Sequence, residues 1–138
     1  MKVGLIGLGR MGEGMSRRMM KADIEVWGYR RNYKKAEEAY EKGYVSGVTT
    51  DIEKLVNVVH QQDTIIGRAP GIFMMVIPAE LVEDTLNELL QFCMEGDIII
   101  DHGNSNFKDS RRRADRLAKL GISYLDCGTS GGVYGLER

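Results

Sequence analysis

Gly7, Gly9 and Gly12 stand near the start of the chain at the spacing of a loop that binds a pyrophosphate. Gly7 permits a tight turn, Gly9 allows a phosphate to approach without a Cβ in the way, and Gly12 allows a helix to pack closely on a strand. The N–H groups and the positive dipole end of that helix would face the phosphates. The loop predicts a dinucleotide site, and its expected binding residues are Gly7, Leu8, Gly9, Arg10, Met11 and Gly12.

The sequence on both sides of this loop supplies the strand and the helix that the motif needs. Residues 3–6 form an apolar run before it, and Met11, Met15 and Met19 follow at the four-residue spacing of a helix face. A glycine-rich turn that binds nothing is the alternative interpretation. The order of strand, glycine turn and helix favours dinucleotide binding.

Basic residues follow the second expected strand, where an acidic residue would select NAD by bonding its adenosine ribose. Arg30, Arg31 and Asn32 stand there, with Lys34 and Lys35 just beyond. Two guanidinium groups can bind a 2′-phosphate through charge-assisted, bidentate hydrogen bonds. We therefore expect NADP as the cofactor, with NAD as a second possibility. The alternative is that these charges are solvated at the start of a helix.

Two further loops carry polar groups after expected strands. Asn104, in the loop 101–110, could bond a substrate hydroxyl or the carboxamide of a nicotinamide, or the loop could only cap the following helix. Residues 128–132 read G-T-S-G-G, and their backbone N–H groups could form a cradle for a carboxylate or a phosphate. A flexible turn is the alternative for this second loop.

The elements that must position these residues alternate between strands and helices. The expected strands cover residues 3–6, 24–29, 44–45, 72–77, 98–100 and 122–126. The expected helices cover about residues 11–21, 32–41, 51–60, 81–90 and 107–120, and Asn32 and Asp51 are expected N-caps. We expect loops at 47–50 and 61–70. This alternation predicts an α/β fold, a doubly wound parallel sheet of the Rossmann-like type.

In such a sheet, ligands bind beyond the carboxyl ends of the strands. The chemically informative segments all fall directly after expected strands. They are residues 7–12, 30–31, 77–78, 102–105 and 129–132. The sequence therefore predicts one composite site at one edge of the sheet.

Length and composition fit a single domain over residues 1–138, with 43% apolar and 28% charged residues. A net charge of −1 argues against nucleic-acid binding, and the longest apolar run, residues 71–79, is too short for a membrane span. The chain starts with its first strand, so we expect no signal peptide and a cytoplasmic location. Cys93 and Cys127 lack metal-type spacing, so no metal site is expected and both are predicted to be buried, reduced thiols.

Three segments together resemble 6-phosphogluconate dehydrogenase, especially its shorter bacterial type, within the β-hydroxyacid dehydrogenase superfamily. They are G-L-I-G-L-G-R-M-G at 4–12, D-H-G-N-S-N-F-K-D-S-R-R-R at 101–113 and D-C-G-T-S-G-G-V-Y-G-L-E-R at 126–138. The resemblance spans the entire chain. Relatives that act on hydroxyisobutyrate-like acids usually have a Ser-Thr pair where Asn104 and Ser105 stand.

The resemblance implies NADP- or NAD-dependent oxidative decarboxylation of 6-phosphogluconate to ribulose 5-phosphate, a step of the pentose phosphate pathway. It places Arg30, Arg31 and Asn32 at the adenosine ribose and Asn104 at both cofactor and substrate. The segment beside the cofactor would be Val76, Ile77 and Pro78. The substrate-binding loop would contain Ser130, Gly131 and Gly132.

The chain also departs from the family pattern. His102 stands where many members have glycine, and many short-type members have an acidic residue in place of Arg30. The family's general base and acid lie beyond Gly132, on a helical domain that also builds the dimer. We therefore expect the catalytic residues beyond Arg138, the C-terminal helical domain to be absent, and the full-length protein to be a homo-oligomer.

Two other functional classes stay open at this stage. One is another β-hydroxyacid dehydrogenase, and the other is a non-catalytic dinucleotide-binding module. Three further expectations concern structure: His60 ends a helix without a functional role, Cys127 lies in the core, and residues 111–113 lie on a solvated helix face.

Overall fold

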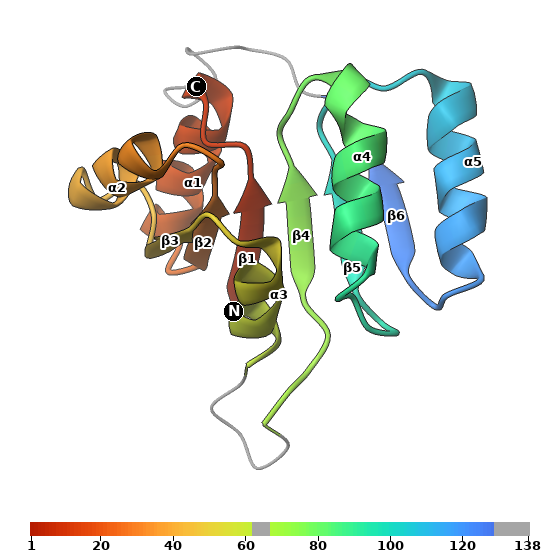
Figure 1. Ribbon diagram of the computed structural model, residues 1–138, viewed down its shortest axis with the longest axis horizontal. Coiled ribbons are helices and arrows are strands. Elements are labelled where there is room, and N and C mark those ends of the chain that lie inside the picture. The colour runs from red at the N-terminus through yellow and green to blue at the C-terminus, as the bar shows by residue number, and fades with distance from the viewer. Residues whose placement is uncertain (62–66, 129–138) are drawn as a thin grey trace.

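The computed structural model describes residues 1–61 and 67–128. Its strands are β1 (Lys2–Ile6), β2 (Glu25–Tyr29), β3 (Gly47–Thr49), β4 (Ile72–Met75), β5 (Ile98–Asp101) and β6 (Ser123–Asp126). Its helices are α1 (Arg10–Lys21), α2 (Tyr33–Glu41), α3 (Ile52–His60), α4 (Ala79–Leu90) and α5 (Phe107–Ala118). The strands form one parallel sheet in the order β3-β2-β1-β4-β5-β6, as Figure 1 shows. The predicted doubly wound α/β fold is confirmed.

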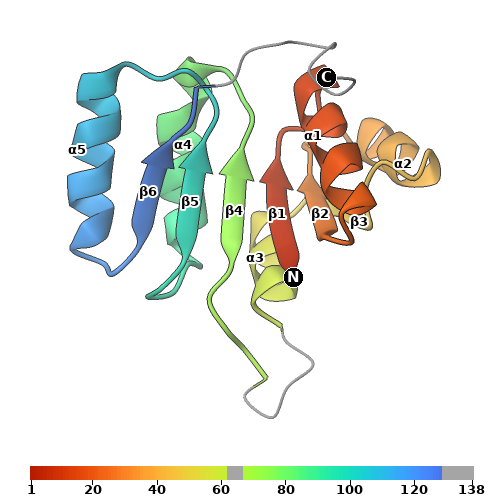
Figure 2. The same cartoon turned by 180° about the vertical axis from the view of Figure 1, so that it is seen from behind.

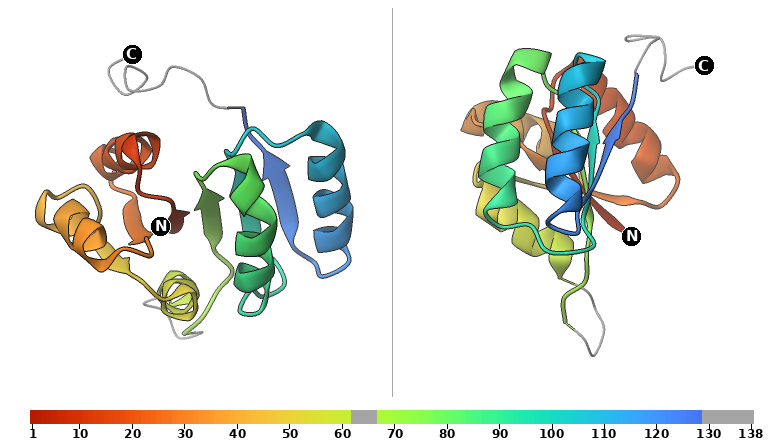
Figure 3. Two further views of the ribbon diagram at one scale, coloured as in Figure 1. Left: turned by 45° about the horizontal axis from the view of Figure 1, so that its top comes forward. Right: turned by 90° about the vertical axis from the view of Figure 1, so that its right-hand side faces the viewer.

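Helices cover both faces of the sheet. One apolar cluster joins β1, β2 and β4 to α1 and α2, and the other joins the sheet to α3, α4 and α5. Figure 2 shows α1 in front of the sheet with α3 behind it, and Figure 3 shows the two layers from the side. Strand order reverses between β1 and β4, where doubly wound sheets bind ligands.

Local side-chain caps explain where several helices start. Asn32 Oδ1 accepts a hydrogen bond from Lys35 N at 3.1 Å, which begins α2. Asp51 Oδ1 accepts from Glu53 N at 2.9 Å at the start of α3. Both predicted N-caps are confirmed, since each satisfies backbone N–H groups that have no partner inside the helix.

The third strand lies later in the chain than the sequence predicted. We expected it at residues 44–45, but Val45 is a core residue before the strand, and β3 covers Gly47–Thr49. A Cβ placed on Gly47 would lie 2.5 Å from the ring of Trp27, its partner on β2. Glycine therefore occurs inside this strand because a large side chain of the neighbouring strand fills the space.

Two smaller predictions also need correction. Strand β4 ends at Met75, so Val76 and Ile77 lie outside it, at the start of the turn into α4. The expected loop at 61–70 contains an antiparallel bridge between Gln61 and Arg68. Its other described residues have no regular structure.

Candidate functional site

The structure shows a different surrounding for each of the three glycines in the loop. Gly7 has a φ of +104°, and a Cβ placed on it would lie 2.2 Å from the carbonyl oxygen of Val76. A Cβ on Gly12 would lie 1.9 Å from the carbonyl oxygen of Gly7. A Cβ on Gly9 would meet no described atom within 4 Å, and φ there is −77°. The fold itself therefore requires glycine at positions 7 and 12 but leaves open space at position 9.

The first turn of α1 opens toward this space. Gly9 is its N-cap and provides no side-chain hydrogen bond to the turn. The N–H groups of a first helical turn have no acceptors inside the helix, and the dipole places positive potential there. An anion beside Gly9 would satisfy both features. The residues present thus fit the pyrophosphate of a dinucleotide.

Arg30 and Arg31 have different surroundings, although the sequence predicted the same role for both. Arg30 is half-buried, and its Nη1 donates a hydrogen bond of 2.6 Å to the carbonyl oxygen of Leu8, inside the glycine loop. Its backbone N–H donates to the carbonyl oxygen of Thr49 at 3.3 Å. Arg31 is exposed and has no ion pair within the described part of the chain. Arg30 therefore holds the loop, while the guanidinium of Arg31 faces solvent.

The structure brings the other predicted segments beside the glycine loop. Val76 lies against Gly7, as described above, and a Cβ placed on Gly103 would lie 2.8 Å from the carbonyl oxygen of Ile77. Asn104 follows with an exposed side chain and a φ of +54°. Residues 7–12, 76–78 and 103–104 thus line one edge of the sheet, beyond the carboxyl ends of β1, β4 and β5. Ser130, Gly131 and Gly132 lie outside the described residues.

A buried acidic group, which the sequence did not predict, supports the Asn104 loop. Asp101 is fully buried at the end of β5. Its carboxylate accepts hydrogen bonds from Gly103 N at 2.7 Å, from Ser105 Oγ at 2.6 Å and from Tyr124 OH at 2.5 Å. Burial and the bond to Asp101 raise the pKa of Tyr124, so its hydroxyl stays a donor across the physiological range. The sequence does hold a signal for this buried group: an aspartate ends an apolar strand and is followed by Gly and Ser.

Arg113 contradicts the expectation that residues 111–113 lie on a solvated helix face. Its side chain is 6% exposed, while Arg111 and Arg112 are exposed. Arg113 Nε donates a hydrogen bond of 2.7 Å to Glu83 Oε2, and its Nη1 lies 3.9 Å from Asp101 Oδ2. The bond from Arg113 lowers the pKa of Glu83. The apolar face of α5 therefore carries a charged pair that ties it to α4 and β5.

His102 lies directly beside the candidate site. It is 8% exposed, and burial lowers its pKa from the ordinary 6.5, with only partial compensation by the charge of Asp101. The imidazole is therefore neutral at pH 7. The direction of the pKa shift places the titration of His102 below the usual range of histidine.

His60, expected to have no role, is fully buried at the opposite end of the strands. Its Nε2 lies 2.9 Å from Asp97 Oδ2, and Asp97 also accepts hydrogen bonds from Gly71 N and Met94 N, each at 2.8 Å. These contacts join the end of α3 to the segments that lead into β4 and β5. The pair is a structural connection, remote from the edge that Gly9 and Asn104 occupy.

The cysteines differ from the prediction that both are buried. Cys127 is exposed, and Cys93 is partly buried. Burial raises the pKa of Cys93 to about 12, and the neighbouring Asp97 charge adds to the shift.

Among the described residues, no group of three or more His, Cys, Asp or Glu side chains could hold a metal ion. No described helix has the length and apolarity to cross a membrane.

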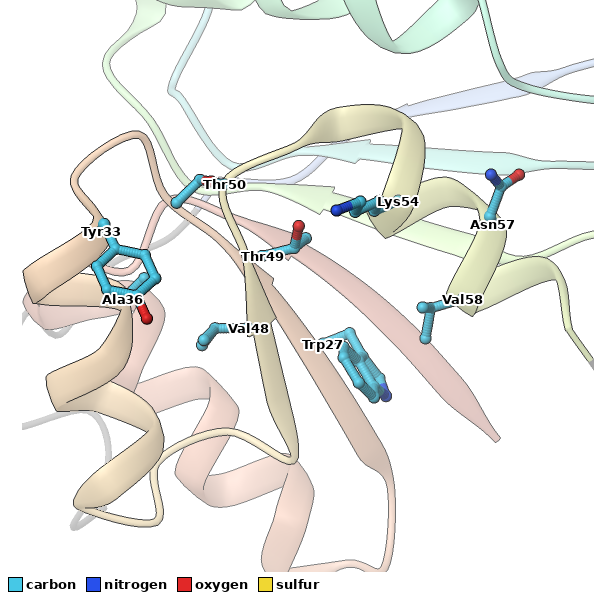
Figure 4. A pocket seen from close by; sticks show the side chains of 9 residues that line it. All are labelled: Trp27, Tyr33, Ala36, Val48, Thr49, Thr50, Lys54, Asn57 and Val58. Atoms are coloured by element: carbon cyan, nitrogen blue, oxygen red, sulfur yellow. The ribbon is translucent and has the colours of Figure 1, made fainter.

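A cavity of about 440 Å³ lies at the β3 edge of the sheet (Figure 4). It lies between α2 and α3, with Tyr33 and Thr50 at one end and Trp27 and Val58 at the other. None of its lining residues belongs to the predicted site. Two lining residues adjoin the predicted segment at the adenosine ribose: Tyr33 follows Asn32 in the chain, and the carbonyl oxygen of Thr49 accepts from Arg30 N.

Comparison with known proteins gives a family match over almost the entire chain. Residues 2–138 match the model of the NAD binding domain of 6-phosphogluconate dehydrogenase. The YqeC protein of Bacillus subtilis, whose name places it among the 6-phosphogluconate dehydrogenases, is 35% identical over 138 residues. A decarboxylating 6-phosphogluconate dehydrogenase of Candida albicans is 35% identical over 133 residues. The chain spans 43% of the first relative and 25% of the second.

Solved structures show the same fold. The 6-phosphogluconate dehydrogenase of Plasmodium falciparum, described with its cofactor NADP+ and with 6-phosphogluconate, matches with a TM-score of 0.81 and 30% identity. The match covers 100% of this chain and 29% of that one. A 3-hydroxyisobutyrate dehydrogenase of Mycobacterium tuberculosis matches with a TM-score of 0.78 at 23% identity, which shows the shared fold alone.

Proposed function

The chain belongs to the family of the NAD binding domain of 6-phosphogluconate dehydrogenase, and from this premise we propose that it serves NADP-dependent oxidative decarboxylation of 6-phosphogluconate. The product is ribulose 5-phosphate, in the pentose phosphate pathway. This chain supplies the cofactor-binding domain, residues 1–138, and part of the substrate site. The protein acts as a homo-oligomer in the cytoplasm.

The open space at Gly9 carries the proposal. The fold requires Gly7 and Gly12 for its own packing, but nothing in the described structure occupies the place beside Gly9. An uncapped helix N-terminus adjoins that place. A ligand pyrophosphate explains both features, because it needs close backbone approach and unsatisfied N–H donors.

The residues around this space have different roles in binding the cofactor. Residues 7–12 hold the pyrophosphate, and Arg30 keeps this loop in shape through the Leu8 carbonyl. Arg31 binds the 2′-phosphate that distinguishes NADP from NAD, since its guanidinium is exposed and Asn32 is engaged in capping α2. Val76, Ile77 and Pro78 form the wall beside the ring that reacts.

Asn104 joins cofactor and substrate in this proposal. It orients the carboxamide of the cofactor and a hydroxyl of the substrate, and the substrate is further held by Ser130, Gly131 and Gly132. The bound nicotinamide ring supplies the redox chemistry by taking up a hydride. His102 stays neutral beside Asn104, so it adds no charge to the site at pH 7. No residue of this chain is assigned the general base or the general acid.

Side-by-side calorimetric titrations with NADP and NAD test this proposal. We expect the chain to bind NADP more tightly, and Arg31→Ala to weaken NADP binding by about tenfold to thirtyfold, the equivalent of about one charge-assisted hydrogen bond. NAD affinity should not change in this variant. The matched control is Arg111→Ala, because Arg111 is also exposed but lies on α5. The proposal would be refuted if Arg31→Ala lost the same affinity for NADP and for NAD, or if the wild type bound neither cofactor.

A further inference from the structure

The loop that carries Asn104 is bonded on both sides of this residue to one buried carboxylate. Oδ1 of Asp101 accepts from the N–H of Gly103, and Oδ2 accepts from the hydroxyl of Ser105. We infer that Asp101 is a positioning residue that fixes Asn104 for the nicotinamide half of the cofactor. This inference rests on the proposed function.

The backbone of Asn104 forms a sharp turn. Its φ of +54° lies in the left-handed region, which asparagine adopts more readily than most other residues with a side chain. The two flanking bonds hold the turn, and His102 N donates to the carbonyl oxygen of Met75 at 2.8 Å to join the loop to β4. Close contact of Gly103 with Ile77 leaves no room for a Cβ. The turn therefore has one arrangement, with the Asn104 side chain exposed at the edge of the sheet.

The carboxylate is itself held in place by neighbouring elements. Tyr124 OH on β6 donates to Oδ2 at 2.5 Å. Arg113 on α5 lies 3.9 Å from the same oxygen and is fixed by its bond to Glu83 on α4. Asp101 is fully buried, and its carboxylate is stabilised by the hydrogen bond from Tyr124 and by the positive charge of Arg113 nearby. Helices α4 and α5 thereby support a loop that neither of them forms.

An amide at position 101 is a poor substitute for the carboxylate. Both oxygens of Asp101 accept hydrogen bonds, whereas Asn has one acceptor oxygen and an NH₂ group that only donates. Asp101→Asn therefore either loses the bond to Gly103 or makes the hydroxyls of Ser105 and Tyr124 turn to accept from the NH₂ group, and it removes the negative charge opposite Arg113. In either case the contacts that flank Asn104 are weakened.

Strand β5 offers a matched control at its other end. Asp97, the residue before the strand, is also fully buried and also accepts two backbone N–H bonds, along with its contact to His60. Asp97→Asn therefore disturbs a comparable buried network far from Asn104. Both variants should unfold at lower temperature than the wild type. Only Asp101→Asn should affect the cofactor site.

The test compares two ligands by calorimetry: NADP, and adenosine 2′,5′-bisphosphate, which is the half of NADP without the nicotinamide. We expect Asp101→Asn to weaken NADP by about tenfold and the bisphosphate by less than about twofold. Asp97→Asn should leave both affinities within about twofold of the wild type. Unchanged NADP binding in Asp101→Asn, or an equal loss of both ligands, would overturn the inference.

Two milder variants and a measurement of hydrogen exchange test the same inference in other ways. If Asp101→Asn does not fold, Ser105→Ala and Tyr124→Phe each remove one donor to the carboxylate, and each should weaken NADP by about threefold without affecting the bisphosphate. A wild type that binds neither ligand would refute the proposed function. Hydrogen exchange at the Gly103 amide then tests the bond to Asp101 by itself: faster exchange in Asp101→Ala, which removes both acceptor oxygens, supports this bond, and unchanged exchange overturns it.

Discussion

Gly9 and Gly12 should respond differently to replacement by alanine, and the structure gives the size of each effect on stability. In Gly12→Ala the new Cβ would lie 1.9 Å from the Gly7 carbonyl oxygen, so the backbone must move. Such overpacking costs about 1 to 3 kcal/mol of unfolding free energy. For a domain of this size, the melting temperature should fall by about 3 to 10 °C.

Gly9→Ala should behave in the opposite way. Its Cβ meets nothing described within 4 Å, and its φ of −77° suits alanine. Loss of a favourable N-cap residue and reduced entropy of the unfolded chain nearly cancel, so stability should change by less than about 0.5 kcal/mol. The same Cβ would stand where the pyrophosphate approaches. Losing one charge-assisted bond there, about 2 kcal/mol, weakens NADP by about thirtyfold.

Thermal unfolding followed by circular dichroism and calorimetric NADP titration measure both effects. We expect Gly12→Ala to melt earlier and Gly9→Ala to keep its stability while losing affinity. Each variant is the control for the other. Wild-type affinity in Gly9→Ala would show that the open space at this residue is not the path of the phosphates, and the glycine loop would then be a structural turn.

Four further predictions follow from individual contacts and from the division of roles. Arg30→Ala should weaken NADP and NAD equally in calorimetry and lower stability by about 1 kcal/mol, because it loses the bond to Leu8 that shapes the loop; a selective loss of NADP would contradict this. The folded-state pKa of His102 is below its unfolded value of 6.5, so the contribution of His102 to the unfolding free energy, measured in urea as the difference between wild type and His102→Gln, should be constant above pH 6.5 and fall as the pH is lowered from there toward the folded pKa; an identical pH dependence in the two proteins would exclude this group as its source. A thiol reagent at pH 8 should modify exposed Cys127 rapidly and Cys93, with its pKa near 12, slowly; equal rates would argue against the burial of Cys93. The purified chain should form no NADPH from 6-phosphogluconate, and measurable turnover would show that it contains the catalytic pair.

Local sequence signals predicted most of the fold. Apolar runs identified five of the six strands, and Asn32 and Asp51 cap helices as expected, because a cap depends on residues only three positions apart. The third strand was misplaced because Gly47 is set by Trp27, a residue on another strand. That constraint exists only after the strands pair.

The candidate site was predictable as a set of segments but not in its supporting contacts. Parallel strands bring their carboxyl ends to one edge, so the loops after them had to meet. The burial of Arg113 depends on Glu83, 30 residues away, and that of His60 depends on Asp97, 37 residues away. Charged residues in a sequence are interpreted as exposed unless their partners are known, and these partners come from tertiary structure.

Amide NMR spectra recorded during titration with NADP locate the dinucleotide site on the molecule. We expect the largest chemical-shift changes at residues 7–12, at Arg31 and at residues 103–105, while the amides of His60 and Asp97, at the far end of the strands, stay unchanged. Shifts confined to the residues around the cavity at Trp27, or the absence of any shift at Gly9, would contradict a dinucleotide site at the edge of β1, β4 and β5.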